Sequence, residues 1–252
     1  SSIHAVERWK KKIFTHVSHN STIGWSAIFL ENHDQSRCLN KFLERENISF
    51  YSASALASIY FFLYGTPFIY QGQEIGMTNV KWKNINDMDD IRAKRTYEEA
   101  VGQGKDPDEV LAYFSELGRD NARTPMQWDD SENGGFTVGK PWIKCNDNYR
   151  TINAQSQVND PNSLYNYYKR LIQCYHDHAD IVRQAAFRPM YEKYQGLIAY
   201  EREVNGKGLL VIVNFTNEKL MFQKIDQKCV LSNYHETESE WLQPYEARIY
   251  SK

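Results

Sequence analysis

Apolar residues recur along the N-terminal segment at the spacing of a helix. They stand at Ile3, Val6, Trp9, Ile13 and Phe14. A run of three lysines at 10–12 falls mostly on the opposite side. The pattern predicts an amphipathic helix with the lysines on its solvated face.

Two short apolar runs follow, at 25–30 and 67–70, and each stops abruptly at polar residues, as a buried parallel strand does. Between them, residues 50–64 are apolar on nearly all sides up to Gly65, which predicts a buried helix that ends at the glycine. Strand, helix and strand with short connections predict a parallel βαβ unit, in which active groups gather where the strands end.

The pattern changes twice beyond this unit. Residues 75–160 are polar and rich in loops, with one helical stretch at 108–117, and long excursions of this kind are usually functional. Asp160-Pro161 is predicted to cap a helix, whose apolar face is Leu164, Tyr167, Tyr168, Leu171, Ile172 and Tyr175. Short apolar runs at 196–200, 209–213 and 247–250, with a hairpin signal at Asn205-Gly206, then predict a small antiparallel β domain.

Composition and charge narrow the partners. With 252 residues, 41% of them hydrophobic, the chain has room for one large core and a small one. Its 30 basic and 32 acidic side chains leave a net charge of −2, so no field attracts nucleic acid or an anionic membrane, and the expected partner is small and neutral. Four scattered cysteines without metal-ligand spacing indicate reduced thiols in a cytoplasmic protein, and we expect neither a metal nor a cofactor. No apolar stretch is long enough for a membrane span, and the charged first ten residues do not resemble a signal peptide.

The candidate chemistry lies in the polar hexapeptide Asn32–Arg37, at the end of the first apolar run. His33 and Asp34, flanked by Gln35 and Arg37, combine a hydrogen-bond donor and acceptor with two groups that recognise hydroxyls, which suits a sugar ring. A His-Asp pair alone is more often a structural ion pair, because polar groups at strand ends need partners in any fold.

Three long segments carry a family resemblance. Residues 29–37, 65–79 and 118–129, together with Asn159-Asp160-Pro161-Asn162-Ser163, resemble motifs of the α-amylase clan, glycoside hydrolase family 13. Within it they are similar to the branch of oligo-1,6-glucosidases, α-glucosidases and trehalose-6-phosphate hydrolases. The likeness runs in the same order along almost the whole chain.

The resemblance implies a (β/α)8 barrel with three essential carboxylates at its C-terminal face. Asp34 matches the aspartate after the seventh strand, which holds sugar hydroxyls and favours the oxocarbenium-like transition state, while His33 hydrogen-bonds the same ring. Gln35 and Arg37 would line the neighbouring leaving-group subsite. Arg123 would close the pocket around the non-reducing-end glucose and so enforce exo-action.

Other conspicuous residues have structural interpretations. Arg119 and Asp120 are expected to form a structural salt bridge, and Glu74 to anchor the loop after the last barrel strand. Residues 129–134 mimic the front of a calcium-binding loop, but Lys140 stands where the bidentate glutamate belongs, so we expect no calcium there.

The family's nucleophile and acid/base lie upstream of the His-Asp motif, and this chain shows no counterpart. Only Glu7 and Glu31 are acidic residues before His33, and neither lies in matching surroundings. The expected fold class is therefore α/β plus β: the C-terminal part of a (β/α)8 TIM barrel, with strands seven and eight, at 1–179, followed by a small antiparallel β-sandwich domain at 180–252. An open part-barrel exposes strand edges, so we expect a missing N-terminal half or a homo-oligomer to cover them.

The expected parent function is retaining exo-hydrolysis of α-glucosidic bonds, preferably α-1,6, in short oligosaccharides, with this chain inactive alone. Two alternatives stay open. One is a part of a trehalose-6-phosphate hydrolase, since the residues that set linkage and sugar specificity lie near the nucleophile. The other is a non-catalytic carbohydrate-binding module that kept the sugar-contacting residues.

Overall fold

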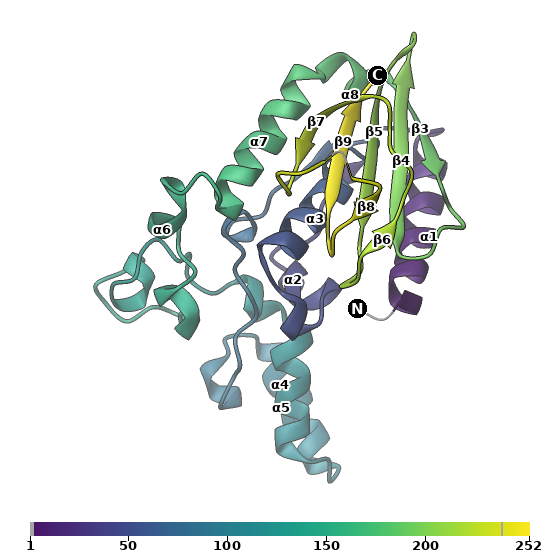
Figure 1. Cartoon of the computed structure of the whole chain (residues 1–252). Coiled ribbons are helices and arrows are strands. Elements are labelled where there is room, and N and C mark those ends of the chain that lie inside the picture. The colour runs from purple at the N-terminus through teal and green to yellow at the C-terminus, as the bar shows by residue number, and fades with distance from the viewer. Residues whose placement is uncertain (1–2, 238) are drawn as a thin grey trace. The chain divides into compact units, whose positions relative to one another are not determined.

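The computed structural model describes residues 3–237 and 239–252, and the chain divides into two compact units (Figure 1). The sheet unit comprises Ser1–Phe29, Glu44–Phe68 and Asn166–Lys252. The loop unit comprises Leu30–Leu43 and Ile69–Tyr165. The predicted domain boundary after residue 179 stays a prediction.

The predicted βαβ unit is present in the sheet unit. Strand β1 (Ala27–Ile28) pairs in parallel with β2 (Thr66–Pro67), and helix α3 (Phe50–Phe61) connects them after a 3-10 turn, η1 (Arg45–Asn47). Ser49 caps α3 through a reciprocal pair of hydrogen bonds with Ser52. The amphipathic helix predicted at the N-terminus is α1 (Ile3–Asn20).

Full burial of the two parallel strands was a wrong expectation. Each strand is two residues long, and Trp25, Phe29 and Phe68 beside them are exposed. The physical reason is that β1 and β2 form a two-stranded sheet, so among the described residues no further strand extends it. Apolar residues that a larger parallel sheet would bury therefore face solvent.

The C-terminal strands form a five-stranded antiparallel sheet in the order β3-β4-β5-β9-β7. Its members are β3 (Ala186–Met190), β4 (Leu197–Val204), β5 (Lys207–Asn214), β7 (Lys228–Ser232) and β9 (Ala247–Ser251). The hairpin between β4 and β5 turns at Asn205 and Gly206, whose φ angles of 50° and 77° fit a left-handed two-residue turn and confirm the sequence signal.

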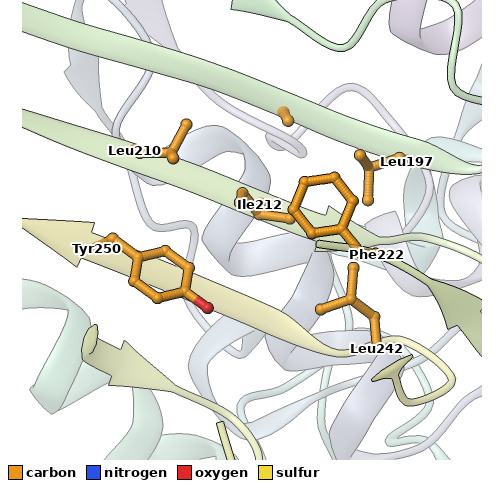
Figure 2. Close-up of a cluster of buried hydrophobic side chains, with 7 residues drawn as sticks. Leu197, Leu210, Ile212, Phe222, Leu242 and Tyr250 are labelled. Atoms are coloured by element: carbon orange, nitrogen blue, oxygen red, sulfur yellow. The ribbon is translucent and has the colours of Figure 1, made fainter. Parts of the chain in front are cut away.

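Both faces of this sheet are covered. On one face a cluster of apolar side chains packs under the short two-stranded sheet of β6 (Leu220–Met221) and β8 (Trp241–Leu242), as Figure 2 shows. On the other face lies α3, where the Tyr200 hydroxyl donates to the Ile59 carbonyl over 2.9 Å. The predicted antiparallel sheet is confirmed, and the predicted sandwich stays a prediction.

Two helices precede the sheet: α7 (Leu164–Asp177) and α8 (Ala179–Gln184). The predicted cap of α7 at Asp160-Pro161 was wrong by one turn. The Asp160 side chain accepts from the Asn162 amide, and its carbonyl accepts from the Ser163 amide, so these residues form a separate turn and the helix begins at Leu164.

The loop unit consists of short helices and turns. They are α2 (Cys38–Phe42), η2 (Gln73–Ile75), η3 (Ile85–Asp87), α4 (Ile91–Gly102), α5 (Pro107–Leu117), η4 (Arg119–Ala122), η5 (Glu132–Gly135), η6 (Asp147–Arg150) and α6 (Ala154–Val158). Helix α5 was predicted, whereas α4 was missed because Ala93 is its one buried residue and its short apolar face, Ala93, Tyr97 and Val101, lies among charged residues. Between them lies a small core of Val80, Trp82, Met88, Ala93, Phe114 and Ile143.

The four cysteines are free thiols. Cys38, Cys145 and Cys174 are buried and Cys229 is partly buried. Burial raises the pKa of each, in the case of Cys174 to about 12. Among the helices within the described ranges, none combines the length and apolar character that crossing a bilayer requires.

Candidate active site

The hexapeptide predicted to carry the chemistry forms a tight turn in the loop unit. The Asn32 side chain accepts a hydrogen bond from the Asp34 amide over 2.9 Å, and the Asn32 carbonyl accepts from the Gln35 amide over 3.3 Å. Such a turn, in which Asn bonds the backbone two residues on, is typical of this residue type. It presents His33 and Asp34 outward.

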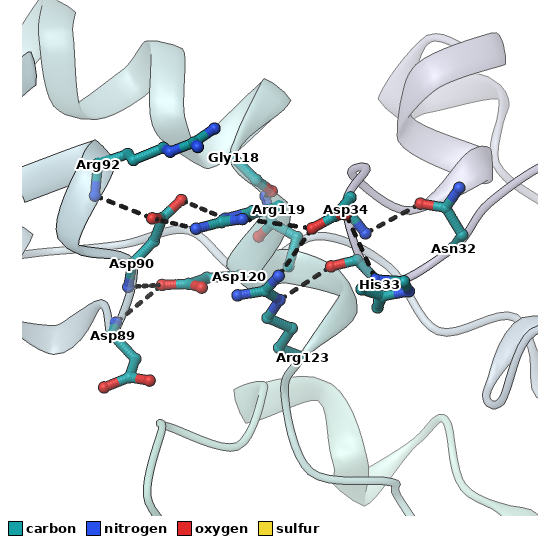
Figure 3. A network of polar contacts seen from close by, with 11 residues as sticks. Asn32, His33, Asp34, Asp89, Asp90, Arg92, Gly118, Arg119, Asp120 and Arg123 are labelled. Carbon is teal, nitrogen blue, oxygen red and sulfur yellow. Dashed lines mark hydrogen bonds and ion pairs between the residues drawn. The ribbon is translucent and has the colours of Figure 1, made fainter.

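Asp34 is the point where His33, Arg119 and Arg123 converge (Figure 3). Its Oδ1 accepts from Arg123 over 2.8 Å and from Arg119 over 3.3 Å, and its Oδ2 lies 3.3 Å from His33 Nε2. Arg123 Nε also donates to the His33 carbonyl over 2.9 Å. With 54% of its side chain exposed, Asp34 retains accessible carboxylate surface for a ligand.

Arg119 links Asp34 to a second carboxylate that the sequence did not point to. It donates to both oxygens of Asp90, over 2.6 and 2.7 Å, in the bidentate geometry of a strong charge-assisted pair. This hydrogen bonding holds the pKa of the Asp90 carboxyl below its ordinary range. Asp90 also caps α4 by accepting from the Arg92 amide, so the N-terminus of α4 is joined to the Asp34 loop through Arg119.

The predicted ion pair between Arg119 and Asp120 was wrong. Asp120 is fully buried and accepts hydrogen bonds from the Asp89 and Asp90 amides, each over 2.8 Å. Asp120 therefore fixes the backbone that carries Asp90, and Arg119 turns toward Asp90 and Asp34. Asp90 could have been found from sequence by treating it as an N-cap, but that signal required recognising α4 first.

Arg37 lies below this surface and holds loops together. Its side chain is 1% exposed and donates to the Gln71 and Asn121 carbonyls, over 2.7 and 3.2 Å, and to Glu31 over 3.3 Å. Burial raises the pKa of Glu31, which Arg37 opposes. In this structure Arg37 positions the Asp34 loop from within, and its contact with a leaving group stays a prediction.

Gln35 and Glu74, which the sequence also singled out, are both partly buried. The Gln35 side chain is partly exposed and accepts from Lys41 over 2.8 Å, so it has donor capacity for a ligand. Glu74 is partly buried, which raises its pKa, and backbone amides of its own loop oppose that rise. Its environment fits the expected role as an anchor of the loop.

A pocket of about 400 Å³ opens beside Asp34. Its charged lining residues are Asp34, Asp90, Arg92 and Arg119, and Thr96 and Tyr113 add hydroxyls. Two carboxylates and two guanidiniums balance, so the pocket favours a neutral ligand that offers hydroxyl groups over a strongly charged one. Within residues 3–237 and 239–252, no three His, Cys, Asp or Glu side chains group closely enough to hold a metal ion.

The family described as "Alpha amylase, catalytic domain" matches residues 2–185, which is most of the chain. The chain therefore belongs to the α-amylase family of glycosidases, glycoside hydrolase family 13.

Its relatives fall in the branch that the sequence motifs indicated. An oligo-1,6-glucosidase of Parageobacillus thermoglucosidasius is 42% identical over 239 residues, which cover 90% of this chain and 42% of the relative. A trehalose-6-phosphate hydrolase of Escherichia coli (strain K12) is 36% identical over 248 residues, covering 94% of this chain and 44% of the relative. The predicted resemblance is confirmed.

Solved structures show the same relation. The trehalose-6-phosphate hydrolase of Bacillus licheniformis superposes with a TM-score of 0.89 at 34% identity, over 98% of this chain and 46% of the other. An isomaltulose synthase variant from Erwinia rhapontici NX5, in complex with sucrose, gives 0.88 at 34% identity, over 97% and 46%. The chain thus spans less than half the length of the relatives that it matches.

Proposed function

We propose that this chain supplies the His33-Asp34 part of the active site of a retaining, exo-acting α-glucosidase. Its substrates would be short α-glucosidic oligosaccharides, with α-1,6 links preferred. The observation that carries the proposal is the convergence of His33, Arg119 and Arg123 on one accessible carboxylate, Asp34. The likeness to oligo-1,6-glucosidases supports the choice of linkage.

The geometry suggests how these groups act on a glucosyl ring. Arg119 and Arg123 both bind Oδ1 of Asp34, so Oδ2, which also lies 3.3 Å from His33 Nε2, is the oxygen that has a lone pair left for a sugar hydroxyl. As positive charge develops on the ring, hydrogen bonds from its hydroxyls to this carboxylate strengthen, which stabilises the transition state. Arg123, held to the His33 carbonyl and to Asp34, is the group that we propose closes the site around one glucose.

Hydrolysis with retention also needs a nucleophile and an acid/base about 5 Å apart. The carboxylate near Asp34, Asp90, is engaged by Arg119 on both oxygens and is unsuited to either role. We infer that both groups come from polypeptide outside these 252 residues, so that this chain alone is inactive. The exposed Trp25, Phe29 and Phe68 around β1 and β2 form the surface that we expect this polypeptide, or a second copy of the chain, to cover.

The test is hydrolysis of p-nitrophenyl α-glucoside and isomaltose, by the chain alone and after mixing with the N-terminal half of a related glucosidase. We expect activity in the mixture only. Activity of the chain alone would overturn the inference that the nucleophile and acid/base are absent. Binding without turnover in either sample would favour a non-catalytic carbohydrate-binding module.

Within the active mixture, Asp34→Asn keeps the shape of the side chain and removes its charge. We expect a loss of about 10²- to 10³-fold in kcat/KM, which is the usual effect of removing one group that stabilises charge in a transition state. Asp130→Asn is the matched control, because Asp130 is exposed and does not line the pocket, and it should leave the rate unchanged. Equal rates for the two variants would contradict the role of Asp34.

Trehalose 6-phosphate hydrolysis is the second candidate, and one side chain favours it. Arg92 is exposed at the pocket beside Asp34 and offers a guanidinium suited to a phosphate. If the substrate is phosphorylated, Arg92→Gln should raise KM for trehalose 6-phosphate roughly tenfold, which is the loss of about 1.4 kcal/mol. The same variant should leave isomaltose hydrolysis unchanged.

A further inference from the structure

A second and larger pocket lies elsewhere in the loop unit. It has a volume of about 770 Å³, within the range of about 300–1,000 Å³ that ligand sites usually occupy. The turns η3, η5 and η6 and the segment 140–145 line it, and it shares no lining residue with the pocket beside Asp34. We propose that this pocket binds a neutral oligosaccharide.

An exposed aromatic pair marks the pocket. Trp142 lines the pocket, and 62% of its surface is exposed. Phe136, which is 37% exposed, contacts Trp142 edge-on, with ring centroids 5.4 Å apart and an interplanar angle of 76°. The next residue, Ile143, is buried in the small core of the loop unit, so the backbone that carries Trp142 is fixed. A largely exposed indole on a fixed backbone is suited to stack on the C–H face of a pyranose ring.

The polar lining selects a neutral ligand. Three carboxylates and three cationic groups line the pocket, and their formal charges cancel: Asp87, Glu132, Asp147, Lys140, Lys144 and Arg150. A phosphate or a metal ion would meet groups of both signs, whereas hydroxyls can donate to the carboxylates and accept from the amino groups. Lys144 and Asp147 already pair over 2.7 Å, which orients two of these groups.

Hydrogen bonds between side chains and backbone hold the pocket's loops in place. Asn133, with a left-handed φ of 56°, donates to the Thr137 and Gly139 carbonyls over 3.3 Å each. Asn146 donates to the Thr78 and Asn79 carbonyls over 3.0 and 3.3 Å. A site whose walls are fixed in advance loses less conformational entropy on binding, which makes weak ligands such as sugars bindable.

The first experiment is a titration of the ¹⁵N-labelled chain with isomaltotriose, followed by the indole N–H resonances of its six tryptophans. We expect the Trp142 resonance to shift saturably, with a Kd on the order of 1 mM, which corresponds to about 4 kcal/mol of binding free energy. The proposal would be overturned if the shift did not saturate at isomaltotriose concentrations up to about 50 times the expected Kd. The same shift with glycerol would also overturn it.

Variants separate the pocket from general effects of the sugar. Trp142→Ala should abolish the perturbation of the remaining pocket resonances, whereas Trp241→Ala removes another exposed tryptophan, on β8, and should leave them unchanged. If Trp142→Ala does not fold, Asp147→Asn should weaken binding several-fold in a folded protein. Unchanged binding in the folded variant of either kind would contradict the site.

Two comparisons keep this result apart from the proposed function. Asp34→Asn should leave the Trp142 shift intact, since Asp34 is not in this pocket, and a loss there would place the binding at the Asp34 site instead. Glucose 6-phosphate should bind no more tightly than glucose, because the lining charges cancel; tighter binding would make the pocket an anion site. Neither measurement depends on hydrolysis.

Discussion

Arg37 in the loop unit and Arg202 in the sheet unit are both almost completely buried, and they differ in their partners; Arg248, also buried in the sheet unit, pairs with Glu246. Arg37 in the loop unit pairs with Glu31 and also donates to loop carbonyls. Arg202 in the sheet unit is 0% exposed and donates to the carbonyls of Phe62, Val182 and Ala185, and its guanidinium lies 5.1 Å from the centroid of the Tyr64 ring. Peptide carbonyls replace water around both charges.

The difference lies in what each arginine organises. Phe62 and Ala185 are the C-caps of α3 and α8, and Arg202 supplies donors where helices leave carbonyls unpaired. Arg37 instead ties together three loop segments that lack regular backbone pairing. Arg202 thus terminates helices in the sheet unit, whereas Arg37 stands in for secondary structure in the loop unit.

The strongest test of this contrast is Arg37→Met. The substitution leaves Glu31 buried without its counterion, and we expect a loss of about 3–5 kcal/mol in the free energy of unfolding, measured by urea denaturation. Adding Glu31→Gln should restore a large part of it, because the unpaired charge is then gone. A double variant as unstable as the single one would show that the lost hydrogen bonds, not the charge, dominate.

The free energy of unfolding of Arg37→Met should depend on pH. Burial already holds the pKa of Glu31 above its ordinary 4.5, and without Arg37 it rises further. The folded state then binds a proton that the unfolded state has released, so the variant loses stability as pH rises from about 4.5 through the raised pKa. Equal destabilisation at pH 4 and pH 7 would contradict this account.

Arg202→Met should cost less, about 2–3 kcal/mol. Its carbonyl partners lose their donors, but no carboxylate is left behind and the desolvation of the guanidinium, which lowers the pKa of Arg202, disappears. Its effect should be independent of pH between 5 and 8. A loss as large as that of Arg37→Met would remove the distinction between the two arginines.

Sequence patterns predicted the sheet unit better than the loop unit, because buried apolar surface organises the sheet unit and polar contacts organise the loop unit. Alternation and apolar runs predicted α3, the antiparallel sheet and the Asn205-Gly206 hairpin, because burial of apolar surface decides these elements. The parallel strands came out shorter and more exposed, since their burial depends on strands that pair with them, which a local pattern does not contain.

In the loop unit, polar side chains decide the structure. Asn79 and Asn121 bridge distant backbone groups, and Asp90 meets Arg119 across 29 residues, contacts that leave no periodic trace. Family likeness assigned Asp34 and Arg123 to one expected site, and the structure brings these two residues together. The bidentate Arg119–Asp90 pair could not, because it depends on the fold of α4.

A smaller effect is expected for Asp90→Asn, about 1–2 kcal/mol, from weakening the pair with Arg119 and the cap of α4. Because the pKa of Asp90 is held below its ordinary 3.8, its contribution is present above pH 3.8 and is lost as pH falls through the lower folded value. Urea denaturation from pH 3 to pH 7 should show the gap between wild type and variant narrowing toward the acid end. A difference in stability that does not change with pH would mean that the hydrogen bonds of Asp90, and not its charge, make the contribution.

The smallest effect is expected in the sheet unit, for Gly206→Ala at the β4–β5 turn. The φ of 77° costs an alanine roughly 1 kcal/mol, and nothing lies within 4 Å of the added methyl group. The melting temperature should drop by a few degrees, while the pocket beside Asp34 keeps its ligand affinity. A change in sugar binding would show that the turn acts beyond its own strand pair.

The state of the four thiols makes the chain convenient for labelling chemistry. Alkylation and maleimide coupling need a thiolate, and burial suppresses that form at Cys38, Cys145, Cys174 and Cys229. A single cysteine introduced at an exposed position, such as 130, would therefore react well ahead of the native thiols near neutral pH. A fluorophore or spin label can thus be placed on the intact sequence without first removing any of its own sulfur atoms.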